Sequence, residues 1–168
     1  MLRTIWEDVR REFGYGNIVS RLIIINASIF VIINIVGIIL FAVNGAKPSP
    51  VFDKVVELFS MPANWKLALT HPWAIFTHMF LHTAFKHILF NMLFLYWFGR
   101  IVGDFIGYHR ILPVYLMGGL VGMVFFMLSA NLLDYSGRYA LGASAAVMAI
   151  TTAAGTITPN YIMTAFYR

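Results

Sequence analysis

The stretch THMFLHTAFKHILFN, residues 77–91, places three histidines and one asparagine in otherwise aromatic and aliphatic sequence. His87 and Asn91 are four residues apart, so on a helix their side chains lie on one face, one above the other. The segment that they begin, residues 86–102, is apolar enough to enter a bilayer. Because polar side chains are costly inside lipid, such a pair marks a candidate functional site.

The composition of the chain is that of a membrane protein. Of its 168 residues, 60% are hydrophobic and 11% are charged, whereas about 25% of the residues of soluble domains are charged. The chain has no cysteine, which excludes disulfides and thiolate metal sites. The formal net charge of +5 arises from lysines and arginines that are scattered along the chain. We therefore expect the lipid bilayer as a partner, no nucleic acid and no cofactor.

Four apolar segments predict an all-α fold, a polytopic transmembrane helix bundle. The expected spans are about residues 18–43, 86–102, 111–133 and 141–158. We interpret residues 1–17 as a charged, amphipathic lead at the cytoplasmic membrane surface, and residues 18–168 as one membrane domain. Residues 44–85 form an interfacial loop, in which we expect short helices rather than strands because alternating patterns are absent.

Polar and small residues inside the apolar segments predict how the helices pack. Asn26 and Asn34 in the first segment are expected to form hydrogen bonds between helices. Gly118 and Gly122 form a G-x-x-x-G pair that allows another helix to approach closely. The segment 141–158 is rich in glycine and alanine, so we expect a central helix that is packed on all sides.

The distribution of charge predicts the orientation in the membrane. Arginines occur in the N-terminal lead and at Arg100 and Arg110, and such segments favour the cytoplasmic side. Lysines in the interfacial loop favour the opposite orientation, and we choose the cytoplasmic N-terminus. Because successive spans alternate in direction, the helices that begin near His87 and Ser144 then start at a similar depth below the outer surface.

Ser144 follows Gly142 at the expected start of the fourth helix. The free backbone N–H groups of a helix start favour a developing negative charge. By itself, a serine at this position is explained as an N-cap. His87 and Asn91, however, can donate hydrogen bonds at the same depth from a neighbouring helix. A hydroxyl nucleophile with helix-start and side-chain donors provides the groups of an acyl-transfer site with an oxyanion hole.

These motifs, in this order, resemble those of the rhomboid intramembrane serine proteases. The resemblance extends over about residues 73–161 and rests on H-x-x-x-N at 87–91 and on G-x-S at 142–144. Further matching positions are His78, His82, Gly99 and Gly107.

The resemblance implies a rhomboid-like fold, with four of the family's six core helices present in this chain. It also implies that Ser144 is the nucleophile and that His87, Asn91 and the Ser144 backbone N–H hold the oxyanion. The expected partners are transmembrane protein substrates, which are cut within or next to a transmembrane segment. The expected location is the bacterial inner (plasma) membrane, with the chain as a multi-pass protein and its N-terminus cytoplasmic.

The family's general base is a histidine on its sixth helix, and no histidine follows Ser144 in this chain. A base takes the serine proton and later gives one to the leaving amine. We therefore expect the chain as given to be inactive alone. The family commonly has a glycine after the serine, where this chain has Ala145, and we expect the extra methyl group to narrow the site.

Other interpretations of the same residues are possible. His78 and His82 have the spacing of a metal-binding pair, but no H-E-x-x-H glutamate accompanies them. We prefer packing and hydrogen bonding within the loop, with no metal. The alternative function is a non-catalytic rhomboid-like protein that binds membrane helices. A small transporter or channel subunit is disfavoured because no span has regularly spaced charges.

Overall fold

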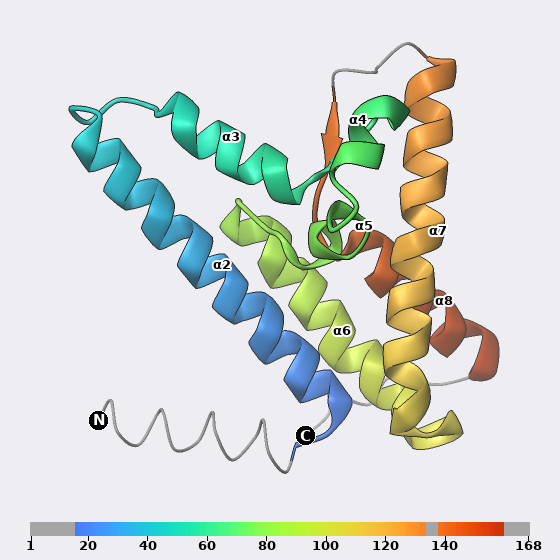
Figure 1. The fold of residues 1–168 in the computed structure, drawn as a ribbon. Helices are drawn as coiled ribbons and strands as arrows, with labels where there is room; N and C mark the ends of the chain where they lie inside the picture. The colour runs from blue at the N-terminus through green and yellow to red at the C-terminus, as the bar shows by residue number, and fades with distance from the viewer. Residues whose placement is uncertain (1–15, 134–137, 160–168) are drawn as a thin grey trace, which may run out of the picture.

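The computed structural model describes residues 16–133 and 138–159 (Figure 1). Its helices are α2 (Ile18–Val43), α3 (Pro50–Phe59), α4 (Trp65–Thr70), α5 (Ala74–Thr77), α6 (Phe85–Ile106), α7 (Ile111–Leu132) and α8 (Ser144–Ile157). Two 3₁₀ turns, η1 (His78–Phe80) and η2 (Tyr108–Arg110), and two strands, β1 (Met61–Pro62) and β2 (Tyr139–Ala140), connect them. The predicted all-α, polytopic fold is confirmed. The expected lead, residues 1–17, lies outside the described residues except for its last two positions.

Helices α2, α6 and α7 are long and apolar enough to cross a membrane, whereas α8 has 14 residues and is shorter. It begins at Ser144 rather than at the expected residue 141. The reason is that β2 pairs antiparallel with β1, with Tyr139 opposite Pro62 and Ala140 opposite Met61. Gly142, with a φ of 109°, then turns the chain toward the helix.

In the interfacial loop, α3 extends from the upper end of α2, α4 lies above α5, and α5 packs against α7, which rises beyond both (Figure 1). The expected short helices are present, but the expectation missed strand β1. Two side-chain hydrogen bonds connect successive parts of the loop. Trp73 Nε1–H donates to Leu58 O at 2.7 Å, and Thr77 Oγ1–H donates to Phe59 O at 2.8 Å. The loop is therefore a folded layer, and its η1 turn packs against α8.

Glycines and alanines determine how closely the helices approach. A Cβ at Gly118 would overlap Ala149 Cβ, and one at Gly122 would overlap Ala145 Cβ. The predicted close approach at the G-x-x-x-G pair is therefore confirmed, with α8 as the partner of α7. On the other side of α6, a Cβ at Gly99 would come within 2.9 Å of Val19 on α2.

The two asparagines of α2 behave differently. Asn26 is fully buried, and its Nδ2 donates to Leu22 O at 2.9 Å and to Tyr115 Oη on α7 at 3.3 Å. Tyr115 O–H in turn donates to Met79 O at 2.9 Å, which connects the loop to both helices. Asn34 was expected to bond to another helix, but its Nδ2 donates to Phe30 O of α2 itself. Within the described residues, therefore, Asn26 bonds to a second helix and Asn34 bonds to its own.

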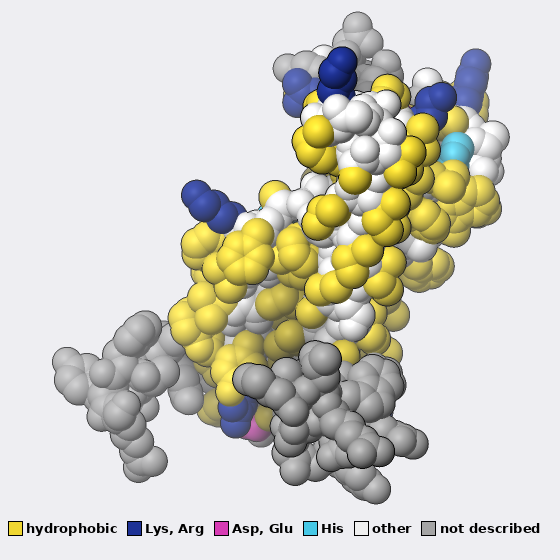
Figure 2. All heavy atoms as spheres, turned by 90° about the vertical axis from the view of Figure 1, so that its left-hand side faces the viewer, with side chains coloured by type: hydrophobic (Ala, Val, Ile, Leu, Met, Phe, Trp, Pro, Cys, Tyr) yellow, Lys and Arg dark blue, Asp and Glu magenta, His cyan; other side chains and the backbone are white. Residues whose placement is uncertain are grey.

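Helix α8 packs against α6 and α7, and its inward residues include Ala146, Val147 and Ile150. The expectation of packing on all sides is wrong for the described residues, because Met148 is 56% exposed on the remaining face. The outer surface of the bundle is also apolar. Figure 2 shows a face that is hydrophobic through its middle, with lysine and arginine side chains toward its ends. Such a surface suits lipid contact.

Candidate active site

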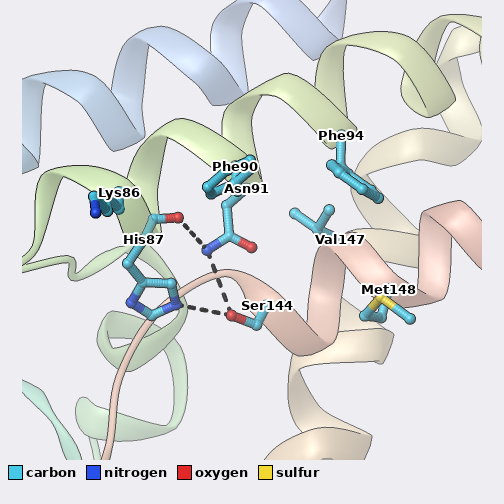
Figure 3. A pocket seen from close by; sticks show the side chains of 8 residues that line it. All are labelled: Lys86, His87, Phe90, Asn91, Phe94, Ser144, Val147 and Met148. Atoms are coloured by element: carbon cyan, nitrogen blue, oxygen red, sulfur yellow. Dashed lines mark hydrogen bonds between the residues drawn. The ribbon is translucent and has the colours of Figure 1, made fainter.

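The structure brings the three predicted site residues together. His87 and Asn91 lie in the first two turns of α6, and Ser144 is the first residue of α8. His87 Nε2 lies 2.8 Å from Ser144 Oγ, and Asn91 Nδ2 donates to the same Oγ at 3.4 Å (Figure 3). Asn91 Nδ2 also donates to His87 O at 3.0 Å, which fixes the amide along the helix. The serine hydroxyl is therefore held between two polar side chains of the neighbouring helix.

Gly142 allows this close approach. It adopts a φ of 109°, and a Cβ at this position would overlap the His87 ring. Its N–H donates to His78 O at 2.8 Å, which attaches the turn before α8 to the loop. Any residue with a side chain would be strained here and would also displace the imidazole. The glycine of the G-x-S motif thus positions Ser144 beside His87.

His82 contacts both Asn91 and the start of α8, a role that was not predicted from the sequence. It is fully buried, and its Nε2 accepts the Ala143 N–H at 3.2 Å and lies 3.3 Å from Asn91 Nδ2. Both neighbours are donors, so Nε2 is the unprotonated nitrogen and Nδ1 carries the ring proton, facing Phe80 O at 3.4 Å. Burial, with a smaller contribution from His87, lowers the pKa of His82 to about 4. His82 is therefore a neutral acceptor that holds Asn91 and the start of α8 in place.

His78 packs and forms a hydrogen bond within the loop, as the sequence predicted for it. It is buried, and its Nδ1–H donates to Ala74 O at 2.7 Å. Burial lowers the pKa of His78, which keeps the ring neutral at pH 7. Sequence spacing treated His78 and His82 as an equivalent pair. The structure separates them, because only His82 reaches Asn91.

An open groove of about 400 Å³ leads to Ser144 between α6 and α8. Its walls are mostly apolar, with Phe90 and Phe94 on α6 facing Val147 and Met148 on α8 (Figure 3). Ala145 does not line this groove and instead faces α7. The expectation that its methyl group narrows the site is therefore wrong, since the side chain points toward the glycines of α7.

The arrangement offers several hydrogen-bond donors to an oxygen beside Ser144 Oγ. As the first residue of α8, Ser144 has a backbone N–H without an intrahelical acceptor. The Asn91 amide adds a second donor, and a protonated His87 Nε2 would be a third. The positive end of the helix dipole at the start of α8 also favours negative charge at this place. The chemistry that these groups suit is stabilisation of an oxyanion next to a hydroxyl nucleophile.

Fold and site together define a polytopic helical membrane protein with a serine held among polar groups at a helix start. Among known protein families, the Rhomboid domain matches residues 69–162, more than half of the 168-residue chain. The chain belongs to the rhomboid family and is an integral membrane protein. No match was found among curated proteins.

Proposed function

We propose that this protein is an intramembrane serine endopeptidase of the rhomboid type. The observation that supports this most directly is the placement of His87 Nε2 at 2.8 Å and of Asn91 Nδ2 at 3.4 Å from Ser144 Oγ. The substrates are transmembrane proteins, cut within or next to a membrane-spanning segment. The N-terminus is cytoplasmic and the membrane is a bacterial inner membrane, so that Ser144 lies near the outer surface.

In the proposed reaction, Ser144 Oγ attacks the carbonyl carbon of the scissile peptide bond. The carbonyl oxygen becomes an oxyanion and accepts hydrogen bonds from the Ser144 N–H, Asn91 Nδ2 and His87 Nε2. The proton of the Ser144 hydroxyl passes to water, and collapse of the intermediate expels the amine, which takes a proton from water, and leaves an acyl-enzyme that water hydrolyses. Donors positioned before the reaction stabilise the charge without reorganisation, and each such donor typically accounts for about 10²–10³ in kcat.

The hydroxyl proton of Ser144 needs an acceptor for the attack to proceed. Asn91 Nδ2 donates to Ser144 Oγ in the resting site, and a protonated His87 Nε2 donates to the same oxygen, so neither neighbour then accepts the hydroxyl proton. Within residues 16–133 and 138–159, His87 Nδ1 has no hydrogen-bond partner that would orient the ring as a base. We therefore assign His87 to the oxyanion and propose that proton removal limits turnover of the 168-residue polypeptide.

The test is cleavage of a labelled transmembrane substrate in proteoliposomes, followed over many hours. Slow cleavage that disappears in Ser144→Ala and persists in Ser129→Ala supports the proposal, because Ser129 lies on α7 and its hydroxyl bonds to Phe126 O. Equal cleavage by the Ser144→Ala protein would overturn it. Substrate that binds without any chemistry at Ser144 would instead favour a non-catalytic rhomboid-like protein that binds membrane helices.

A further inference from the structure

A lysine lies at one end of the groove that leads to Ser144. Lys86 is the second residue of α6, lines the groove and is exposed. None of the residues that line the groove is acidic, and Lys86 makes no ion pair within the described part of the chain. Figure 3 shows Lys86 beside His87, at the opposite end of the groove from Phe94 and Met148. The groove therefore carries an uncompensated positive charge at its His87 end.

The rest of the groove is apolar and follows the direction of the helices. Lys86, Phe90 and Phe94 are spaced four residues apart and form one ridge along α6. The two rings are 58% and 37% exposed, and Met148 across the groove is 56% exposed. A helix or extended strand that lay in this groove would contact apolar side chains inside the membrane and an ammonium group at the surface end.

We propose that Lys86 is a specificity-determining residue, which selects transmembrane segments that carry an aspartate or glutamate at the end beside Ser144. The occupant is a single membrane-spanning segment of another protein, and the argument for it is this match of charge and apolar surface. A carboxylate at that end would be attracted to the Lys86 ammonium. The following apolar residues would cover the exposed rings of the ridge. The inference rests on the proposed function in one respect, that substrates bind where Ser144 lies.

Binding can be measured without any catalysis by using the Ser144→Ala protein in nanodiscs of zwitterionic lipid. Three labelled peptides share one apolar segment and differ only in an Asp, Asn or Lys at the end that meets the loop side of the bundle. Exposed ion pairs have modest energies, so the Asp peptide should bind about two- to fivefold more tightly than the Asn peptide. That difference should disappear in Lys86→Gln, and in Lys86→Glu the Lys peptide should bind most tightly.

Lys66 provides a matched control. It is also an exposed lysine, but it lies over the Trp65 ring at 5.6 Å in α4 and does not line the groove. The Lys66→Gln protein should keep the full preference for the Asp peptide. Because Lys86 is exposed at the helix start, its replacement should leave the fold intact, which circular dichroism and thermal unfolding of the same samples would verify.

Several outcomes would overturn the inference. They are equal binding of the Asp and Asn peptides, no binding of any peptide, persistence of the preference in Lys86→Gln, or an equal effect of Lys66→Gln. The inference would also fail if Lys86→Gln changed peptide binding only in nanodiscs that contain anionic lipid. It would fail as well if a second copy of the chain covered the groove. None of these results depends on reaction at Ser144, so each would leave the proposed chemistry to be judged by its own experiments.

Discussion

Replacement of Asn91 by alanine should weaken binding of a transition-state analogue far more than it changes the fold. The reporter is a peptide boronate, to whose boron Ser144 Oγ adds while the hydroxyl proton goes to the buffer. The product is a tetrahedral anion, one oxygen of which takes the place of the oxyanion. This reaction tests the nucleophile and the donors without requiring a base from the protein.

The expected magnitude follows from the position of Asn91. Its side chain is 7% exposed, and its amide is one of the donors that face Ser144 Oγ. A hydrogen bond to a charged group contributes about 1.5–3 kcal/mol. Asn91→Ala should therefore raise the dissociation constant of the boronate about 10- to 150-fold, at about 1.4 kcal/mol per factor of ten. The same substitution removes one donor from His82 Nε2, which should lower the unfolding free energy by about 1 kcal/mol.

The assay is a titration of the boronate against the protein in detergent, with unfolding followed on the same samples. Asn34→Ala is the matched control, because its amide bonds to Phe30 O of its own helix and does not line the Ser144 groove. Asn34→Ala should leave the dissociation constant unchanged. A loss of affinity in Asn91→Ala no larger than that in Asn34→Ala would refute the oxyanion assignment.

Three further predictions concern stability and turnover. The pKa of His82 is about 4 in the folded state and 6.5 in the unfolded state. Between these two pH values the unfolded state binds more protons than the folded state. The unfolding free energy should therefore fall by about 1–3 kcal/mol as the pH drops from 7 to 4. Denaturant titrations in detergent should show this slope, and a His82→Gln protein with the same slope would contradict it. Gly122→Ala should destabilise the folded protein by about 1–3 kcal/mol, because the new methyl group would overlap Ala145. Gly155→Ala, which has open space around it, should be neutral or stabilising. Equal melting temperatures of the two variants would contradict the close packing. The 168-residue polypeptide should cleave a transmembrane substrate on the order of 10⁶ more slowly than a serine protease with an oriented base, and rapid Ser144-dependent cleavage in proteoliposomes would show that His87 suffices as the base.

The fold could be predicted from the sequence as far as length and apolarity determine it. Long apolar segments indicate α2, α6 and α7. A helix that spans a membrane forms its backbone hydrogen bonds internally and needs about 20 mainly apolar residues to cross the hydrocarbon core. The start of α8 could not be predicted in the same way. Residues 141–143 could begin a helix by their composition, but they follow residues 139 and 140, which pair with the distant strand β1, and Gly142 turns the chain before Ser144.

The candidate site was predictable where its geometry is local. The spacing of His87 and Asn91 places them on one helix face, and Gly142 before Ser144 indicates a special backbone conformation, which the φ of 109° shows. The role of His82 depends on the folded loop, which carries its ring to Ala143, 61 positions later in the chain. No sequence spacing encodes a contact of that kind.

The direction of a small side chain on a helix that has two packed neighbours is equally hard to predict. Ala145 follows the serine directly, yet its methyl group faces Gly122 on α7 rather than the groove. The same reasoning explains Asn34, whose amide bonds back to Phe30 O of α2 itself. Both errors arise because a sequence pattern defines helix faces but not the elements that meet them.

The central claim is that Ser144 Oγ is a nucleophile in a site with preformed donors for an oxyanion. Boron NMR of the peptide boronate bound to the protein tests it most directly, because trigonal and tetrahedral boron give separate signals. We predict a tetrahedral signal with the unaltered chain and with Ser129→Ala, and only trigonal boron with Ser144→Ala. A tetrahedral signal that persists in Ser144→Ala, or that never forms with the unaltered chain, would contradict the account.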